Sequence, residues 1–515
     1  MTTARRSLPC VAAAVCVLSA WPLAAAERWK IGLTAGNKTI DALVVAGSSA
    51  SAPTVLLVGG LAGSDATADI VSRDAAAFEA LPQARRPFRL IAVPLANPDG
   101  RPLQFPPAGT AYKDNAESHV LWRWIGIHAP DLAIVVGESA GGLADALSQS
   151  AVGFVGTVPS RVVAAKPGTL RSLGATIPPS EAHLELTRRL RRTPREVAEE
   201  LGKVYGHEFD QPTYISAMAL IAQLRLGHTA EVLRLTDRYL NGSADSFARP
   251  SQSSLAAHLL FYEIASRTTG GESSDRAAKL VIRAAGSGFT DDGSLRAFMP
   301  LNGGWSDSVF MDIPILAKAG ALSGERKYFD MAARHFFYMQ KIVGRPDGLY
   351  RHQASTDAAW GRGNGFPALG LALTLTNLPT DHPDYPALLA SFQAHMKALS
   401  RYQDVNGMFL EVIDYPGAYP EYSATAMIAT AMLRGVRRGW LDASVYQPIV
   451  DRAWRAILIR TASDGRLFDV AESTGTRGLT LEDYLRRAAI LERDPRGGAF
   501  AMLLATEIAG LGVEF

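Results

Sequence analysis

The chain has 515 residues, of which 48% are hydrophobic and 20% are charged, with 52 Lys and Arg against 50 Asp and Glu. These values are ordinary for globular proteins. They argue against a disordered chain, a collagen-like chain and a strongly basic nucleic-acid-binding protein. The length corresponds to about three average domains.

The first 26 residues have the pattern of a secretory signal peptide. Two arginines precede an apolar run at residues 11–18, and three alanines ending at Ala26 form an A-x-A cleavage site. Cleavage there removes both cysteines, Cys10 and Cys16, and brings the formal charge from +2 to zero. No later stretch has the roughly 18 uncharged apolar residues of a membrane helix. We therefore expect a periplasmic or secreted chain without thiol chemistry and without membrane or nucleic-acid partners.

Residues 27–160 alternate short apolar runs with helical stretches. The alternation predicts βαβ units and an α/β domain with a mainly parallel sheet. The basic, turn-rich segment 161–192 is expected to connect this domain to the next. The predicted strands are 54–58, 88–93 and 132–136, and the predicted helices are 117–128 and a helix from Leu143.

A serine esterase is one interpretation of this domain. The sequence G-E-S-A-G-G at 137–142 lies between a predicted strand and a predicted helix, which is the context of a nucleophile elbow with Ser139 as nucleophile. The nearby downstream histidine is His183, and no H-G-G-G loop occurs near Gly59.

The competing interpretation rests on a resemblance to the zinc carboxypeptidases, in the stretch 55–65 and in the N-P-D-G turn at 97–100. That resemblance implies metal ligands at Ala62, Asp65 and Gly137. A catalytic zinc needs about three protein ligands, including nitrogen donors. Two of the three positions offer none, so we expect a degenerate peptidase-like domain without metal or cofactor.

From about Thr193 the pattern is almost wholly helical. Thr193, Pro194 and Glu196 supply an N-cap, an N1 proline and a capping box. About a dozen helical stretches follow, very apolar ones alternating with amphipathic ones. This alternation predicts a closed double ring of helices with functional residues in the loops at one end. Examples are 212–226, 251–268, 325–343, 384–402, 421–438 and 443–460.

Three loops of this half combine aromatic and polar residues: W-S-D-S-V-F-M at 305–311, D-G-L-Y-R-H at 347–352 and W-G-R-G-N-G-F at 360–366. Taken singly, Asp307 is equally well explained as a helix cap, and His352 as a hydrogen-bonded structural residue. Taken together, the loops offer aromatic platforms, a guanidinium and an acid. A sugar acid needs these groups for ring stacking, carboxylate pairing and proton transfer.

These motifs, with E-Y-S-A-T-A-M at 421–427, resemble the unsaturated glucuronyl and rhamnogalacturonyl hydrolases, glycoside hydrolase families 88 and 105, and more closely 105, over about residues 195–511. The resemblance implies an (α/α)6 barrel over 193–515. It implies hydration of the 4,5-unsaturated uronic acid that lyases leave on oligosaccharides, with Asp307 as general acid and base and His352 bonding the uronate or the water. It also implies a substrate site made of Trp305, Trp360, Arg362, Asn364, Phe366, Glu421 and Gln252.

The sequence departs from the family pattern in three places, one of which is the short stretch between His352 and Trp360. The family's second active-site Asp is absent from the stretch P-S-Q-S-S-L at 250–255, where Gln252 stands in its place and Asp245 is displaced in spacing. The last aromatic residue of the third loop is Phe366. These departures leave open a non-catalytic carbohydrate-binding protein as well as the esterase. The expected partner is an unsaturated uronyl oligosaccharide derived from pectin, bound by a monomer or weak oligomer, and Asp312 and Glu421 are the next acids to consider.

Overall fold

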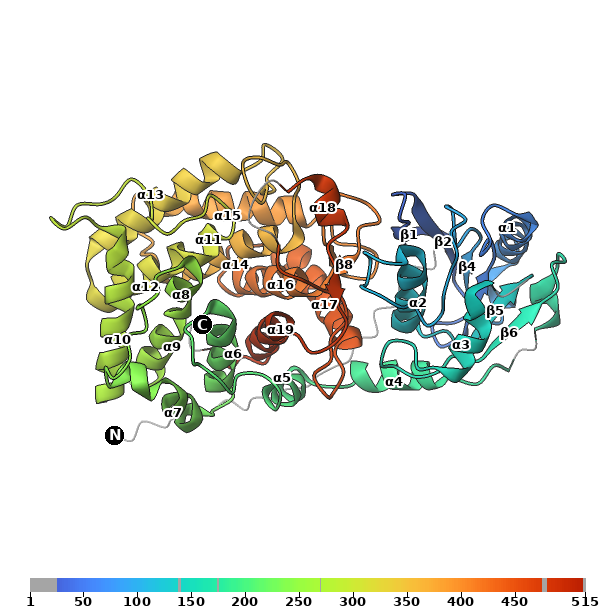
Figure 1. Ribbon diagram of the computed structural model, residues 1–515, viewed down its shortest axis with the longest axis horizontal. Helices are drawn as coiled ribbons and strands as arrows, with labels where there is room; N and C mark the ends of the chain where they lie inside the picture. The colour runs from blue at the N-terminus through green and yellow to red at the C-terminus, as the bar shows by residue number, and fades with distance from the viewer. Residues whose placement is uncertain (1–25, 138–139, 174–175, 269, 475–478, 513–515) are drawn as a thin grey trace, which may run out of the picture.

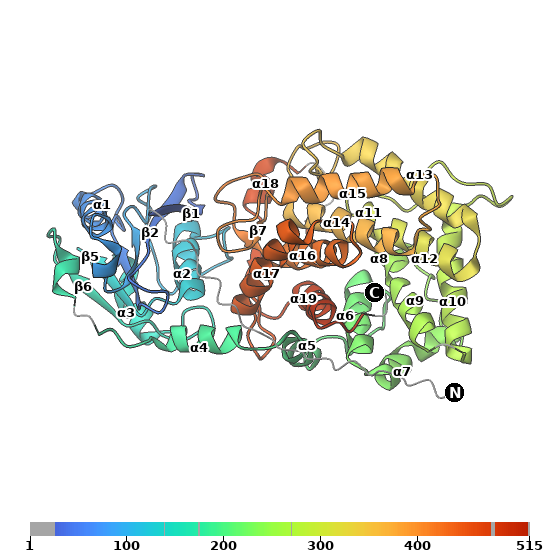
Figure 2. The ribbon, with the colours of Figure 1, turned by 180° about the vertical axis from the view of Figure 1, so that it is seen from behind.

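The computed structural model describes residues 26–137, 140–173, 176–268, 270–474 and 479–512, so most of the expected signal peptide and Ser139 lie outside the described residues. Two bodies lie side by side, a sheet domain from the N-terminal part of the chain and a larger helical domain (Figures 1 and 2). Within the described ranges, no helix has the length and apolar character needed to cross a membrane.

The N-terminal domain is built on a six-stranded sheet in the order β1-β2-β4-β3-β5-β6. β3, β4, β5 and β6 are parallel, as predicted, whereas β1 and β2 add an antiparallel edge. Side chains of β3 alternate between the two faces, so Val55 and Leu57 pack with α1, whereas Leu56 and Val58 pack with α2 and α3. The bounds are β1 Glu27–Leu33, β2 Thr39–Val45, β3 Thr54–Val58, α1 Ala66–Glu79, β4 Arg89–Val93, α2 Ala116–His128, β5 Leu132–Val136, α3 Leu143–Gln149 and β6 Ser160–Val163.

The sheet extends past the boundary predicted at residue 160, because β6 ends at Val163. The predicted connector also contains a helix, α4 (Glu181–Leu190), which Ser180 caps through a bond from the His183 amide. The segment is therefore partly ordered structure rather than turns alone.

The helical domain is a double ring. Six helices contact one another in sequence order, and the last packs on the first: α6 Tyr214–Arg225, α9 Leu259–Arg267, α12 Ile313–Ser323, α14 Gly361–Asn377, α16 Tyr422–Arg437 and α19 Pro495–Ile508. These inner helices are largely buried along their length. Six half-exposed helices pack outside them: α5 Pro194–Gly202, α7 Thr229–Leu240, α10 Glu272–Ala285, α13 Arg326–Val343, α15 Tyr385–Leu399 and α17 Ala443–Arg460. The predicted apolar inner ring and amphipathic outer ring are both observed.

Local signals placed the helix starts well. α5 begins at Pro194 with the predicted capping box between Thr193 and Glu196. The stretch 251–268 is the exception, because it divides into α8 (Gln252–Ala257) and α9 at His258.

A buried ionic network joins the inner helices at their C-terminal ends. Glu507 of α19 accepts hydrogen bonds from Arg225 of α6 at 3.0 Å and from Arg434 of α16 at 2.9 Å. These arginines hold the pKa of Glu507 below its usual value although burial opposes them. This network stabilises one end of the ring. The loops that start α14 and α16 lie at the other end and contribute no charge to it.

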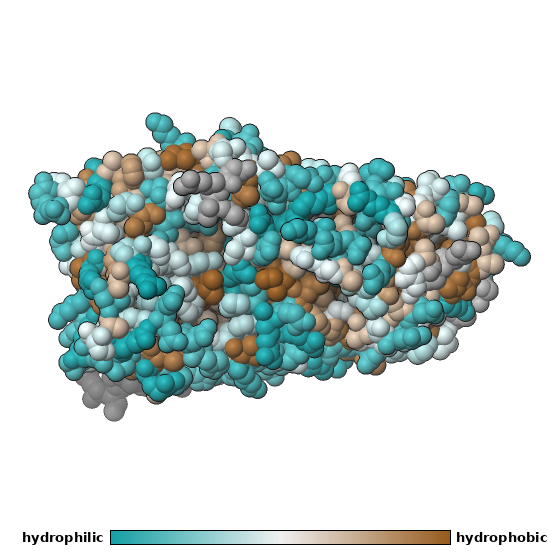
Figure 3. Space-filling model, in the orientation of Figure 1, coloured by the Kyte–Doolittle hydropathy of each residue, from teal (hydrophilic) through white to brown (hydrophobic). Residues whose placement is uncertain are grey.

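The two domains share a continuous core. Tyr419 and Phe468 of the helical domain belong to the same apolar cluster as the α2 face of the sheet domain, and Tyr112 stacks on Tyr419 with ring centroids 4.3 Å apart. Asp469 accepts a hydrogen bond from the Tyr112 hydroxyl at 3.0 Å and pairs with Arg123. Away from this seam, apolar residues form small separate groups on the face shown in Figure 3.

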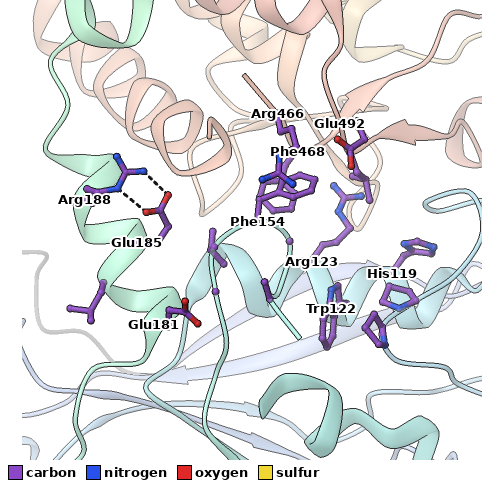
Figure 4. A pocket seen from close by; sticks show the side chains of 18 residues that line it. His119, Trp122, Arg123, Phe154, Glu181, Glu185, Arg188, Arg466, Phe468 and Glu492 are labelled. Carbon is purple, nitrogen blue, oxygen red and sulfur yellow. Dashed lines mark hydrogen bonds and ion pairs between the residues drawn. The ribbon is translucent and has the colours of Figure 1, made fainter. Parts of the chain in front are cut away.

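A cavity of about 870 Å³ also lies at this junction (Figure 4). Its lining includes Trp122 and Arg123 from α2, the Glu185–Arg188 pair from α4, and Phe468. None of the site residues predicted from the sequence lines this cavity.

Candidate functional site at one end of the helical ring

Short backbone pairings bring the three predicted loops together. Ser306 N–H donates to the His352 carbonyl at 2.9 Å, so the first loop lies against the second. Gly361 N–H donates to the Glu411 carbonyl at 2.6 Å, which joins the third loop to a small hairpin of β7 (Phe409–Leu410) and β8 (Pro420–Glu421). Tyr422 N–H then reaches the Asp469 carbonyl at 2.8 Å. The loops that precede the inner helices therefore form one connected surface at this end of the ring.

Asp307 and His352 face each other across the first pairing. The Asp307 Oδ2 atom lies 3.3 Å from His352 Nε2, and neither atom has a hydrogen-bond partner among the described residues. Asp307 occupies the N-cap position of the short helix α11 (Ser308–Met311), but its side chain makes no capping bond. The helix-cap explanation of Asp307 is therefore not what the structure shows. The carboxyl is free for chemistry, and its side chain is 18% exposed.

Aromatic rings surround His352. Its ring lies 4.6 Å from Trp360 and 6.2 Å from the half-buried Trp305, measured between ring centroids. Its Nδ1 atom is 2.7 Å from the hydroxyl of Tyr484, which comes from α18 (Leu481–Leu485). When this hydroxyl donates to Nδ1, the proton of the neutral imidazole is on Nε2 and faces Asp307. The rings hold the imidazole in place, and the Tyr484 hydroxyl bonds its Nδ1 atom.

Arg362 and Glu421, which the resemblance implied as substrate-binding residues, are both buried and bonded to other parts of the protein. Arg362 is 2% exposed, and it donates through Nε to Ser423 Oγ at 2.9 Å and through Nη2 to the Ala471 carbonyl. Glu421 is fully buried 3.8 Å from Arg362 and caps α16 by accepting from the amides of Ser423 and Ala424. Its charge raises the pKa of Arg362, although burial opposes this. The pair is committed to holding the start of α16, because an acid there satisfies free helix amides.

Asn364 and Phe366 are likewise committed to protein contacts. Asn364 is fully buried, donates to the carbonyls of Tyr350 and Trp360 at 2.9 Å each, and accepts from the Tyr350 amide. Phe366 is 1% exposed and packs against Tyr214 and Phe310. Two positions apart on α14, the two side chains leave the helix in different directions, Asn364 toward the loop at Tyr350 and Phe366 toward neighbouring helices, and neither is on the open surface.

Gln252 lies beside the Asp307 segment. Its amide donates to the Ser308 hydroxyl and to Asp312 Oδ2, the latter at 3.2 Å. Asp312 also accepts from His335 Nε2 at 3.1 Å and is fully buried. Asp312 Oδ2 therefore belongs to an internal network that Gln252 links to α11, whereas Asp312 Oδ1 is buried without a hydrogen-bond partner among the described residues.

Three residues of the site were missed from the sequence: Glu411, Tyr419 and Tyr484. Glu411 is fully buried and accepts from Trp360 Nε1 at 2.9 Å, and burial together with nearby Glu421 raises its pKa well above the usual value. Burial also raises the pKa values of both tyrosines. The T-x-x-D pattern at 480–483 is a capping box that could have located the helix carrying Tyr484. No local pattern marks Glu411 or Tyr419.

The N-terminal domain shows other uses for its candidate residues. Asp65 caps α1 by accepting from the Thr67 amide at 2.8 Å. His183 pairs through Nδ1 with Asp131 at 2.7 Å, just before β5, whereas the proposed elbow follows the opposite end of that strand. His183 is therefore not placed to serve a nucleophile at 137–142. Over the described ranges, no group of three or more His, Cys, Asp or Glu side chains is arranged to hold a metal ion.

Comparison with known sequences gives relatives for the helical half. The chain is 29% identical over 178 residues to an unsaturated rhamnogalacturonyl hydrolase of Bacillus subtilis, covering 33% of this chain and 50% of that protein. It is 26% identical over 183 residues to an unsaturated 3S-rhamnoglycuronyl hydrolase of Formosa agariphila, covering 32% and 48%. The chain thus spans about half the length of the curated relatives it matches.

Solved structures share the fold of the helical domain. A family 105 glycoside hydrolase of C. acetobutylicum superposes with a TM-score of 0.52 at 20% identity, covering 62% of this chain and 99% of that one. A family 88 glycosyl hydrolase of Bacteroides vulgatus gives a TM-score of 0.50 at 16% identity, covering 62% and 100%. The model of Glycosyl Hydrolase Family 88 matches residues 231–511, which is more than half of the sequence and includes every loop of the site described above. The chain therefore belongs to Glycosyl Hydrolase Family 88, as its loop motifs indicated.

Proposed function

We propose that the protein hydrates the 4,5-unsaturated uronic acid at the non-reducing end of lyase-generated oligosaccharides of the pectin or rhamnogalacturonan type. One observation carries the proposal: of the site acids Asp307, Asp312, Glu411 and Glu421, only Asp307 has a partly exposed side chain, and its Oδ2 has no protein hydrogen bond. The other three are fully buried, and each has at least one oxygen bonded within the protein. Asp312 and Glu411 also have one unbonded oxygen each, so exposure is what distinguishes Asp307.

In the proposed reaction, protonated Asp307 gives its proton to C4 of the vinyl ether, and the ring oxygen shares the positive charge that develops at C5. Water adds to C5 and returns a proton to the Asp307 carboxylate. The hemiketal then opens, and the neighbouring sugar leaves from C1. One carboxyl group serves as acid and then as base, so the spacing rule for paired carboxylates does not apply. We assign to His352, whose Nε2 lies 3.3 Å from Asp307 Oδ2, the role of holding the water or the uronate.

The relatives support the substrate class, because one is named for unsaturated rhamnogalacturonyl substrates and another for unsaturated rhamnoglycuronyl substrates. Trp305 supplies a half-buried ring face beside Asp307 on which a sugar can stack. Recognition of the uronate carboxylate is not assigned to Arg362, whose guanidinium is occupied by Ser423, Ala471 and Glu421. We also propose that the chain is exported, on the basis of its leader pattern, and the N-terminal mass of exported protein tests this.

The test is the loss of ultraviolet absorbance of unsaturated di- and oligosaccharides with the wild-type chain and with Asp307→Asn. An amide cannot transfer the proton, so kcat should fall about 10⁴-fold, the upper end for one acid–base group. The matched control is Asp292→Asn in an exposed turn, where Asn can also accept the bonds from Thr290 and Ser294. Activity retained in Asp307→Asn, or no turnover by the wild type on the whole panel, would refute the proposal.

A further inference from the structure

A turn of the N-terminal domain holds the short helix that bears Tyr484. The turn joins β1 to β2, and its Asn37 donates through Nδ2 to Glu482 at 2.7 Å and accepts from Arg486 at 2.6 Å. Arg486 also donates to the Ala35 carbonyl at 2.7 Å, and Glu482 pairs with Arg486 at 2.9 Å. The contacts join residues about 450 positions apart in sequence, so they exist only in the folded protein.

The short helix α18 contacts the Asp307–His352 pair directly through one side chain, Tyr484. α18 has only five residues, so it has little stability of its own and depends on such contacts. Tyr484 projects from it, is fully buried, and lies with its hydroxyl 2.7 Å from His352 Nδ1. His352 Nε2 in turn faces Asp307 Oδ2 at 3.3 Å. Burial raises the pKa of Tyr484, and the charge of Asp307 adds to this, so the phenol keeps its proton.

A second contact between the domains acts on the same segment. Asp469, which pairs with Tyr112 and Arg123 of the N-terminal domain, immediately precedes β9 (Val470–Ala471). β9 pairs with β10 (Ala489–Ile490), so Asp469 lies close to the strand that follows α18 in the chain. The N-terminal domain therefore contacts this part of the chain twice. It contacts α18 through Asn37, and it contacts the residue before β9 through Tyr112 and Arg123.

We propose that the N-terminal domain is a positioning unit of the active site, in which Asn37 and Arg486 place α18 so that Tyr484 fixes the tautomer and orientation of His352 beside Asp307. The described residues of the N-terminal domain form no metal cluster, and this proposal gives the domain a role. The proposal rests on the proposed function, because its kinetic test measures turnover of an unsaturated uronyl substrate. Asn37 and Tyr484 are positioning residues, because each acts on Asp307 through His352.

The test uses Asn37→Gly in the full-length chain. Asn37 has a φ of +61°, which glycine adopts without strain, so the substitution removes the two side-chain bonds and keeps the turn. Asn115→Gly is the matched control, because Asn115 also has a positive φ, of 44°, in the same domain but bonds only the Ala108 carbonyl. Tyr484→Phe removes the hydroxyl alone.

Tyr484→Phe should lower kcat about three- to ten-fold with little change in KM, the effect of one lost hydrogen bond, and should shift the pH profile of kcat. Asn37→Gly should lower kcat about two- to five-fold and speed hydrogen exchange in peptides from residues 479–490. Asn115→Gly should change neither quantity. Wild-type kcat in Asn37→Gly, with or without faster exchange, overturns the proposal.

The two proposals fail in different ways. A wild-type chain that turns over no unsaturated substrate refutes the proposed function. The exchange of residues 479–490 then tests the structural half of the proposal, that Asn37 holds α18: faster exchange in Asn37→Gly but not in Asn115→Gly supports it, and unchanged exchange overturns it.

Discussion

Replacing Glu421 by Gln separates a substrate-binding role from a structural one. Glu421 is fully buried, and its carboxylate accepts from the amides of Ser423, Ala424 and Ala471 while lying 3.8 Å from the guanidinium of Arg362. An amide at this position keeps one acceptor oxygen but loses the charge that compensates Arg362. Breaking a buried pair by removing one partner typically costs about 3–5 kcal/mol. Because the Gln side chain keeps one acceptor oxygen, we expect Glu421→Gln to lower the free energy of unfolding by about 3 kcal/mol, the lower end of that range.

A loss of about 3 kcal/mol corresponds to a fall in Tm of roughly 4–5 °C for a helical domain of about 320 residues. Thermal unfolding followed by circular dichroism measures this shift, and kcat and KM below the transition measure activity. The control is Glu472→Gln, because Glu472 is 44% exposed and lies 3.7 Å from Arg487, and exposed pairs contribute about 0–1 kcal/mol. An unchanged Tm together with a raised KM would refute the structural role and restore Glu421 as a substrate ligand.

Two further outcomes follow from the buried groups. The pKa of Glu411 is raised by burial and by Glu421, so the folded state keeps a proton that the unfolded chain loses above about pH 4.5. The free energy of unfolding should therefore fall as pH rises from that value toward the folded pKa. Glu411→Gln keeps the acceptor for Trp360 but cannot titrate, so its free energy of unfolding, measured by urea titration at several pH values, should depend less on pH. A pH dependence equal to that of the wild type would contradict this. Phe366→Ala should cost about 3–5 kcal/mol by leaving a cavity among Tyr214 and Phe310, measured by urea unfolding, and a loss below about 1 kcal/mol would place the ring outside the core.

The sequence by itself determined the features that local patterns encode. Strands 54–58 and 132–136, the start of α5 at Thr193 and Pro194, and the alternation of apolar and amphipathic helices all depend on neighbours within a few residues, and the structure has them. The loop motifs also identified the family, because a spaced set of Trp, Asp, His and Arg is rarely repeated by chance. Asp307 and His352 were predicted together, and they do face each other.

Only the tertiary structure decided which polar residues are free and which are committed. Glu421 and Asp307 both precede helices, and the sequence offered no means to tell them apart. In the fold, Glu421 caps its helix and pairs with Arg362, whereas Asp307 makes no cap and faces His352. Tyr484 reaches His352 from 132 residues away, and Asn37 reaches Glu482 from 445. Such contacts have no local signature, because they arise when distant loops are brought to one end of a closed ring, where burial favours a partner for most of the remaining polar groups.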